Sequence, residues 1–211
     1  MTLARIIMPE KGVFQVRVEG EAPSAGDRVV ADLDYGLDEG TVDALEEVDP
    51  SAEGVRIPSF SFVRRLEGEA DERTLKENAR LASAMAARFE QLARKTVPDF
   101  RVRRVRLSFG RGRLFLRYTS QTPKCELSHV ASEIRRVFSV GVNYWALGPR
   151  DTVACVGALG PCSRACCCAS WLERYPQNLN PQSLMGSAGA GGTSGMNGTC
   201  GRFKCCLKFE S

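Results

Sequence analysis

A β-hairpin is predicted for the stretch Arg104-Val-Arg-Leu-Ser-Phe-Gly-Arg-Gly-Arg-Leu-Phe-Leu-Arg-Tyr-Thr119. Apolar residues alternate with polar ones up to Phe109, which is the period of a strand with one buried face. Gly110-Arg-Gly112 supplies turn residues, and the chain then runs back. The alternation predicts that Arg104 and Arg106 share one face of the hairpin, while the apolar side chains share the other.

Helical spacing flanks this hairpin on both sides. From Asp71 to about Thr96, apolar residues recur at helical intervals, with Asp71 as the candidate N-cap and Pro98 as the stop. After the hairpin, Thr122 and Pro123 predict the start of a second helix. Its expected buried face consists of Leu127, Val130, Ala131, Ile134 and Val137.

The first sixty residues predict several short strands. Phe14, Val16 and Val18 alternate with polar residues, residues 28–33 follow a Gly-Asp turn, and residues 40–45 are a further candidate. Short strands separated by Gly and Pro favour a small antiparallel sheet or barrel. With another strand at 140–147, we expect an α+β fold. Three regions are predicted: a β-rich region at 1–66, an α/β region at 67–152 and a cysteine-rich, loop-rich module at 153–211.

Six of the nine cysteines form two matched triplets of the pattern Cys-x-Arg-x-x-Cys-Cys. Thiolates bind metals, and such spacings are common around iron–sulfur clusters and in four-cysteine zinc sites. His129 is the only histidine and is expected at the surface, so any metal site here must be rich in sulfur. The candidate ligands are Cys162, Cys167, Cys168, Cys200, Cys205 and Cys206.

Several interpretations of these thiols stay open at this point. An iron–sulfur site, within the chain or shared with partner chains, competes with structural zinc, with buried reduced thiols and with a redox pair. A catalytic cysteine is disfavoured because its usual histidine partner is lacking. The first ten residues carry no apolar signal segment, and no stretch approaches the length of a membrane span. We therefore expect a cytoplasmic protein, in which disulfides are rare.

Charge is distributed unevenly along the chain. Residues 19–77 carry seventeen acidic and six basic residues, whereas residues 100–125 carry seven arginines, one lysine and no acid. The basic block could bind nucleic acid, with Phe109, Phe115 and Tyr118 available for stacking. Alternatively, it is a strand face that pairs with the acidic first half. The candidate nucleic-acid contacts are Arg104, Arg106, Arg111 and Arg113.

The cysteine region resembles the YaaT family, also called RicT. The likeness is most specific over residues 160–168 and 200–210, looser in the upstream residues, and covers most of the chain. Ser163 stands where that family usually has Gly, and the Gly/Ser/Ala-rich stretch at 186–195, which is typical of a flexible linker, stands where a basic segment is usual.

The resemblance implies a non-enzymatic, bacterial, cytoplasmic regulatory subunit. Such proteins act with two small helical partners in a complex that carries iron–sulfur clusters, here expected to be of the [4Fe–4S] type. That complex influences messenger-RNA maturation by ribonuclease Y. By position, the ligands would be the six triplet cysteines, whereas Cys155 and Cys166 have no expected counterpart. The alternative is a nucleic-acid-binding protein with structural zinc or reduced thiols, and a thiol redox enzyme is a weaker third.

Overall fold

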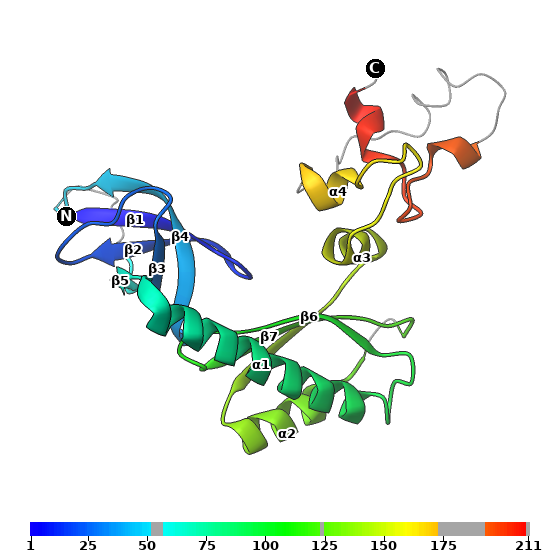
Figure 1. The fold of residues 1–211 in the computed structure, drawn as a ribbon, viewed down its shortest axis with the longest axis horizontal. Helices are drawn as coiled ribbons and strands as arrows, with labels where there is room; N and C mark the ends of the chain where they lie inside the picture. Colours follow the sequence, from blue (N-terminus) through cyan, green and yellow to red (C-terminus); the bar gives the residue numbers. More distant parts are fainter. Residues whose placement is uncertain (52–56, 123–124, 173–192, 210–211) are drawn as a thin grey trace.

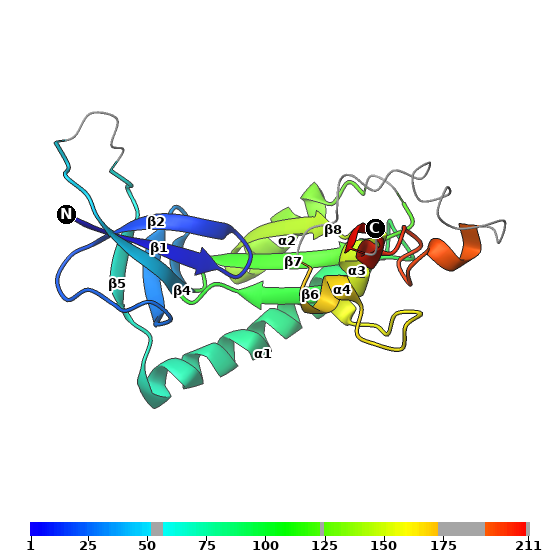
Figure 2. The same cartoon turned by 90° about the horizontal axis from the view of Figure 1, so that it is seen from above.

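The computed structural model describes residues 1–51, 57–122, 125–172 and 193–209. It confirms the expected α+β fold, with an N-terminal barrel, a central sheet covered by helices and a C-terminal part built mainly of loops and short helices (Figure 1). Figure 2 shows the central strands side by side between the barrel and the C-terminal part. Within the described residues, no helix is long and apolar enough to cross a membrane.

Five strands close the N-terminal barrel, in the order β1-β2-β5-β3-β4. Alternate side chains fill its interior, and Ile6 and Val16 are fully buried there. A Cβ on Gly40 would lie 2.4 Å from Ile6, so a glycine is needed where β4 crosses β1. Of the two predicted assemblies, a small antiparallel sheet or a barrel, the structure has the barrel. Its strands are β1 (Thr2–Met8), β2 (Gly12–Val18), β3 (Arg28–Leu33), β4 (Gly36–Glu47) and β5 (Ser61–Arg65).

The long helix α1 (Gly68–Ala93) begins and ends slightly earlier than predicted. Its N-cap is Glu67, so the expectation that Asp71 caps the helix was wrong. Asp71 instead lies in the first turn, where its carboxylate accepts hydrogen bonds from the Glu67 N–H at 2.9 Å and from the Arg64 guanidinium at 2.6 and 2.7 Å. This acid therefore ties the start of α1 to β5.

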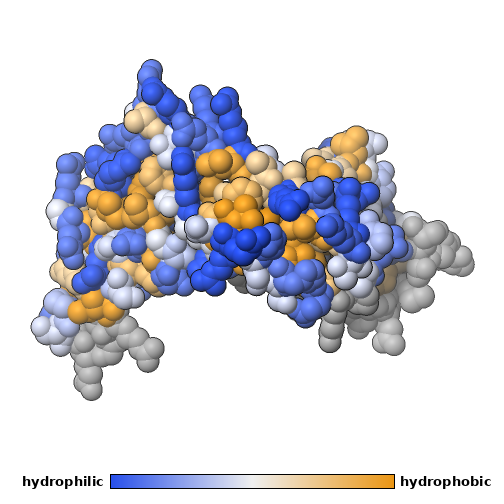
Figure 3. Space-filling view, turned by 90° about the horizontal axis from the view of Figure 1, so that it is seen from below, coloured by the Kyte–Doolittle hydropathy of each residue, from blue (hydrophilic) through white to orange (hydrophobic). Residues whose placement is uncertain are grey.

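The central sheet has the order β6-β7-β8 and is covered on one face by α1 and α2. Strand β6 (Arg101–Leu107) pairs antiparallel with β7 (Arg113–Thr119), which confirms the hairpin, and β7 pairs parallel with β8 (Gly141–Ala146). Phe89 of α1 and Leu116 of β7 are fully buried in the shared core. Seen from below, broad hydrophobic areas alternate with hydrophilic residues over the surface (Figure 3).

Helix α2 (Ser128–Phe138) crosses from β7 to β8 and starts later than Thr122, with Leu127 as its N-cap. Pro123, the predicted first helical residue, lies outside the described residues. Of the expected buried face, Val137 is 52% exposed, so that part of the prediction was wrong. Val130 and Ile134 are the buried residues of α2, and Ala131 and Phe138 are partly buried against the same core.

The C-terminal part begins with helix α3 (Pro149–Val156), which the sequence reasoning did not predict. Gly148 is its N-cap and Pro149 its first residue, a position that suits proline because the missing N–H has no helical partner. Three short turns follow: α4 (Cys167–Ser170), η1 (Thr193–Met196) and η2 (Cys205–Phe209). Most of the predicted linker at 186–195 lies outside the described residues.

Candidate metal centre

The first cysteine triplet begins on a tight antiparallel loop. The Gly160 N–H donates to the Arg164 carbonyl at 2.8 Å, and the Ser163 N–H donates to the Gly160 carbonyl at 2.9 Å. Ser163 adopts a left-handed backbone with φ of 61°, which closes the turn. The loop therefore carries Cys162 at its tip.

The second triplet begins on a loop of the same construction. The Gly198 N–H donates to the Arg202 carbonyl at 2.8 Å, and the Gly201 N–H donates to the Gly198 carbonyl at 2.9 Å. Gly201 has φ of 74°, a conformation that glycine adopts without steric cost. Cys200 thus occupies the place that Cys162 has in the first loop. The matched sequence pattern corresponds to a matched backbone.

Each loop leads into a short helical turn that starts at the second cysteine of its triplet. Helix α4 starts at Cys167, η2 starts at Cys205, and the two turns contact each other. Cys168 and Cys206 follow as the next residues of these turns. Because successive residues on a helix point about 100° apart, neighbouring thiols can reach different points of a shared space.

The two loops and turns enclose a cavity of about 160 Å³. Val153 of α3 and Leu207 of η2 add apolar walls. All six predicted ligands line this cavity, together with a seventh thiol that the pattern did not single out. Cys155 lies instead on the wall of a separate cleft. The cavity thiols belong to Cys162, Cys166, Cys167, Cys168, Cys200, Cys205 and Cys206.

Burial of these thiols is graded. Cys205 is buried and Cys162 is exposed, while the others are intermediate. Burial raises the pKa of the Cys168 thiol, and the neighbouring thiols of Cys166 and Cys205 raise it further. The Arg150 guanidinium of α3 acts in the opposite direction. A metal ion that binds here must therefore displace protons from at least some thiols.

The donor set fits a thiophilic group. Only sulfur atoms among the usual metal-binding side chains line the described cavity, and soft thiolates favour zinc, iron–sulfur clusters or Cu(I). Within the described residues, however, no three Cys, His, Asp or Glu side chains are already grouped to hold one ion. The thiols share a cavity, and rotation of their short side chains is needed to bring several sulfurs onto one group.

Arg164 and Arg202 occupy equivalent places in the two loops, and both side chains are exposed. Their backbone carbonyls accept the hydrogen bonds that close the loops. The repeated arginine therefore marks the closing position of each loop, and a role in stabilising thiolates stays a prediction.

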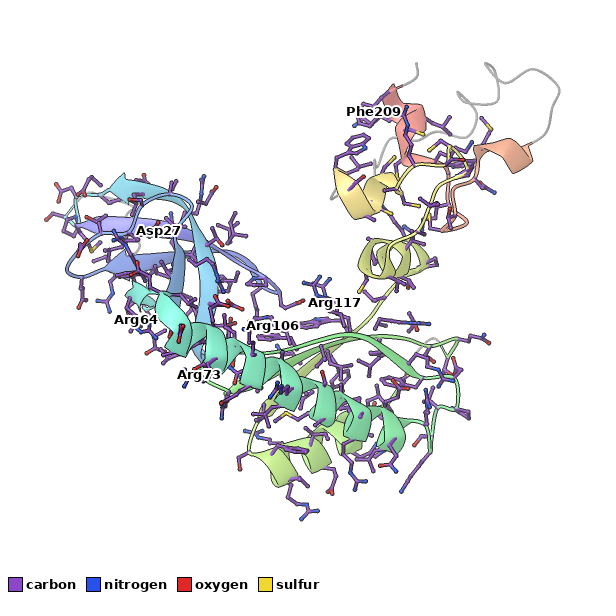
Figure 4. All side chains as sticks on the ribbon, in the orientation of Figure 1. Asp27, Arg64, Arg73, Arg106, Arg117 and Phe209 are labelled. Atoms are coloured by element: carbon purple, nitrogen blue, oxygen red, sulfur yellow. The ribbon has the colours of Figure 1, made fainter. Side chains whose placement is uncertain are left out.

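The four arginines predicted to contact nucleic acid lie in different surroundings. Arg106 is only 15% exposed and forms two hydrogen bonds with Asp38 of the barrel. Arg111 pairs with Glu77 of α1, and Arg113 donates to Asn143 of β8 at 3.3 Å. Arg104 keeps 53% of its side chain exposed. Arg104 and Arg106 lie on the face of the sheet opposite to α1 and α2, as the alternation predicted, and Figure 4 labels Arg106 beside the barrel.

The expectation that Phe115 and Tyr118 are available for stacking was wrong. Phe115 is 1% and Tyr118 6% exposed, because the first packs against the barrel core and the second beneath the helices. Phe109 is partly buried under the Arg64 guanidinium, 5.8 Å from its ring centre. Trp145 of β8 is the exposed aromatic residue of this sheet, and sequence reasoning did not single it out. Its neighbour Tyr144 points to the other face, where it is partly buried against the core.

No family model, curated protein or solved structure matches the chain. The metal-binding chemistry of this region therefore rests on the geometry of the two cysteine loops and on their sulfur donors.

Proposed function

We propose that this protein is a non-catalytic regulatory subunit that holds an iron–sulfur cluster of the [4Fe–4S] type between its two cysteine loops. The observation that carries the proposal is the single cavity lined by seven thiols, which come from two loops far apart in the sequence. Matched backbone hydrogen bonds hold both loops in the same shape, as a site with two equivalent halves requires.

A cluster of this type takes four thiolates, so two from each loop suffice. Cys162 and Cys167 can serve from the first loop, and Cys200 and Cys205 from the second, with Cys168 and Cys206 as the remaining candidates. When bound, the cluster would supply a redox-sensitive, sulfur-ligated link between the loops. The chain's own contribution is to position the thiols and to shield the cavity with apolar walls. Structural zinc in the same cavity is the alternative.

The proposed role is to adapt a ribonuclease of the ribonuclease Y type during messenger-RNA maturation in the bacterial cytoplasm, together with small helical partner proteins. Exposed apolar side chains at the cysteine-rich end support a docking role, since large exposed apolar groups commonly mark interaction sites. Trp171 and Phe209 are 57% and 59% exposed and pack edge to face with ring centres 5.3 Å apart. Figure 4 labels Phe209 at this end of the molecule. Leu159, beside the first loop, is 69% exposed.

Elemental analysis of anaerobically purified protein tests the metal. We expect iron, acid-labile sulfide and a visible charge-transfer band, all strongly reduced in Cys162→Ser and in Cys200→Ser. Cys155→Ser is the matched control, because this thiol lines the other cleft and should leave the iron content unchanged. Colourless protein without iron or sulfide, even after co-expression with partners, would overturn the cluster, and stoichiometric zinc would favour the alternative.

Transcript cleavage in cells tests the regulatory role separately. Deletion of the chain should alter ribonuclease Y-dependent cleavage, and wild-type protein should restore it while Cys200→Ser should not. Normal cleavage in the deletion strain would reject this role without touching the metal assignment.

A further inference from the structure

A second cleft, of about 500 Å³, lies between the barrel, the open face of the sheet and α3. Its volume falls within the range typical of small-molecule sites. It does not share a thiol with the cysteine cavity, since its one cysteine is Cys155. The lining residues Glu10, Arg104, Arg117, Trp145, Arg150 and Asp151 carry its polar and aromatic groups.

Three of these side chains form one row across the sheet. Arg104 of β6 pairs in register with Arg117 of β7, and Arg117 pairs with Trp145 of β8. Side chains of directly paired residues lie on the same face of a sheet. The row therefore places two guanidinium groups next to an indole on the face opposite to α1 and α2, and Figure 4 labels Arg117 on that face.

Glu10, in the turn between β1 and β2, compensates the two neighbouring positive charges. Its carboxylate lies 2.6 Å from Arg117 and 3.5 Å from Arg104, and its side chain is only 2% exposed. The contact with Arg104 is the longer one, and 53% of the Arg104 side chain is exposed. A positively charged group thus remains available to a ligand at the mouth of the cleft.

Trp145 provides a flat surface held in one orientation. Its ring is parallel to that of Phe115 within 3°, with ring centres 6.2 Å apart, and the residue is 40% exposed. Phe115 is fixed in turn by Arg106 above its ring at 4.8 Å. An exposed aromatic plane beside arginines is the arrangement that stacks a base and pairs with its phosphate.

We propose that this cleft binds a nucleotide unit, with the base stacked on Trp145 and the phosphate at Arg104 and Arg117. The unit can come from a free mononucleotide or from a single-stranded nucleic acid, since both offer the same base and phosphate. The proposal goes beyond the metal function and is independent of it, because none of the cavity thiols takes part.

Tryptophan fluorescence provides a direct readout, because the chain has two tryptophans and Trp171 lies in the cysteine-rich end. In full-length Trp171→Phe protein, Trp145 becomes the single reporter. Titrations with adenosine monophosphate and with a short oligoadenylate should quench it. Quenching by the mononucleotide identifies a free-nucleotide site, and quenching by the oligomer alone identifies a strand-binding site. Absence of quenching by both probes would overturn the proposal.

Substitutions in the Trp171→Phe background locate the site. Arg104→Ala should weaken binding about tenfold and reduce its salt dependence, because one phosphate contact is lost. Arg73→Ala, on the outer surface of α1 with 73% of its side chain exposed, is the matched control and should change affinity less than about twofold (Figure 4). If Arg104→Ala and Arg73→Ala change the affinity equally, the nucleotide does not bind in this cleft.

Glu10→Gln should change nucleotide affinity in the direction opposite to Arg104→Ala. Removing the carboxylate leaves both guanidiniums free to pair with phosphate, so binding should tighten several-fold. Circular dichroism checks that the barrel stays folded. Weaker binding by a folded Glu10→Gln protein would overturn the placement of the phosphate.

Discussion

Arg106 of β6 holds Asp38 of β4 through two hydrogen bonds of 2.7 Å each, and this pair joins the central sheet to the barrel. Asp38 is fully buried and also accepts a hydrogen bond from the Tyr35 hydroxyl at 2.8 Å. Burial and the Asp38 carboxylate raise the pKa of Tyr35, so its hydroxyl stays protonated and keeps donating. A charged pair this enclosed fixes the two parts of the molecule in one arrangement.

Asp38→Asn should lower the free energy of unfolding by about 3–5 kcal/mol, because it leaves the Arg106 guanidinium buried without its counter-charge. Urea denaturation at neutral pH measures the change. Asp43→Asn is the control: Asp43 pairs with Arg5 at the surface, where such a pair contributes at most about 1 kcal/mol. Similar losses in the two variants would contradict a special role for the buried pair.

Local periodicity explains how much of the fold the sequence predicted. Strand β2 and the β6–β7 hairpin follow from alternation, and α1 follows from helical spacing. Of the two interpretations of the basic block, pairing with the acidic first half holds for Arg106, which pairs with Asp38. The choice of partners, 68 positions apart, depends on how the barrel packs on the sheet, and no local pattern contains that information.

The candidate site was predictable only where the sequence repeats. The two triplets identified six thiols of the cavity because their loops have the same backbone. Cys166 was named but left out of the predicted ligands, because Lys204 takes its place in the second loop. The N–H groups of Cys166 and Lys204 nevertheless make equivalent hydrogen bonds, to the carbonyls of Ala158 and Met196. Helix α3 was not predicted because its eight residues are too few to show a clear helical period.

Asp71 should make the stability of the α1–β5 junction depend on pH. Hydrogen bonding to the Arg64 guanidinium lowers the pKa of Asp71 in the folded state. A lowered folded pKa stabilises the protein above the unfolded pKa of about 4, and this contribution is lost as pH falls through the folded value. Asp71→Asn should therefore reduce the free energy of unfolding at pH 7. In strong acid, the variant and the wild type should be equally stable.

Urea denaturation at a series of pH values from 7 downward checks this expectation. Glu72→Gln, at the more exposed pair with Arg28, is the control and should show a smaller difference at neutral pH. A gap between wild type and Asp71→Asn that stays constant at every pH would show that the Asp71 charge is not responsible.

Ser163 is the strained position of the first loop. A side chain in the left-handed region costs about 1–2 kcal/mol, whereas the equivalent Gly201 has no such cost. Ser163→Gly should therefore stabilise the folded loop by up to about 1 kcal/mol, which corresponds to about fivefold tighter binding of zinc. Gly201→Ser should have the opposite effect. Competition with a chromophoric zinc chelator measures both, and equal affinities in all three proteins would contradict the strain argument.

Metal removal should loosen the cysteine loops and leave the barrel intact. The turns α4 and η2 have four and five residues, which is too short for a helix to persist without support, so metal–thiolate bonds would hold the loops together. Hydrogen–deuterium exchange with and without chelator measures this effect. The Gly160, Ser163, Gly198 and Gly201 amides should exchange faster after chelation.

The amides that pair β1 with β4 are the internal control, because the barrel core is independent of the thiols and should keep its protection. Cys200→Ser protein should show fast loop exchange even before chelator is added. Equal protection of the loop amides in the metal-loaded and chelated protein would mean that backbone hydrogen bonds alone hold the loops. Metal binding would then not stabilise the loop conformation. A change in metal occupancy could not be transmitted to a partner through the shape of these loops.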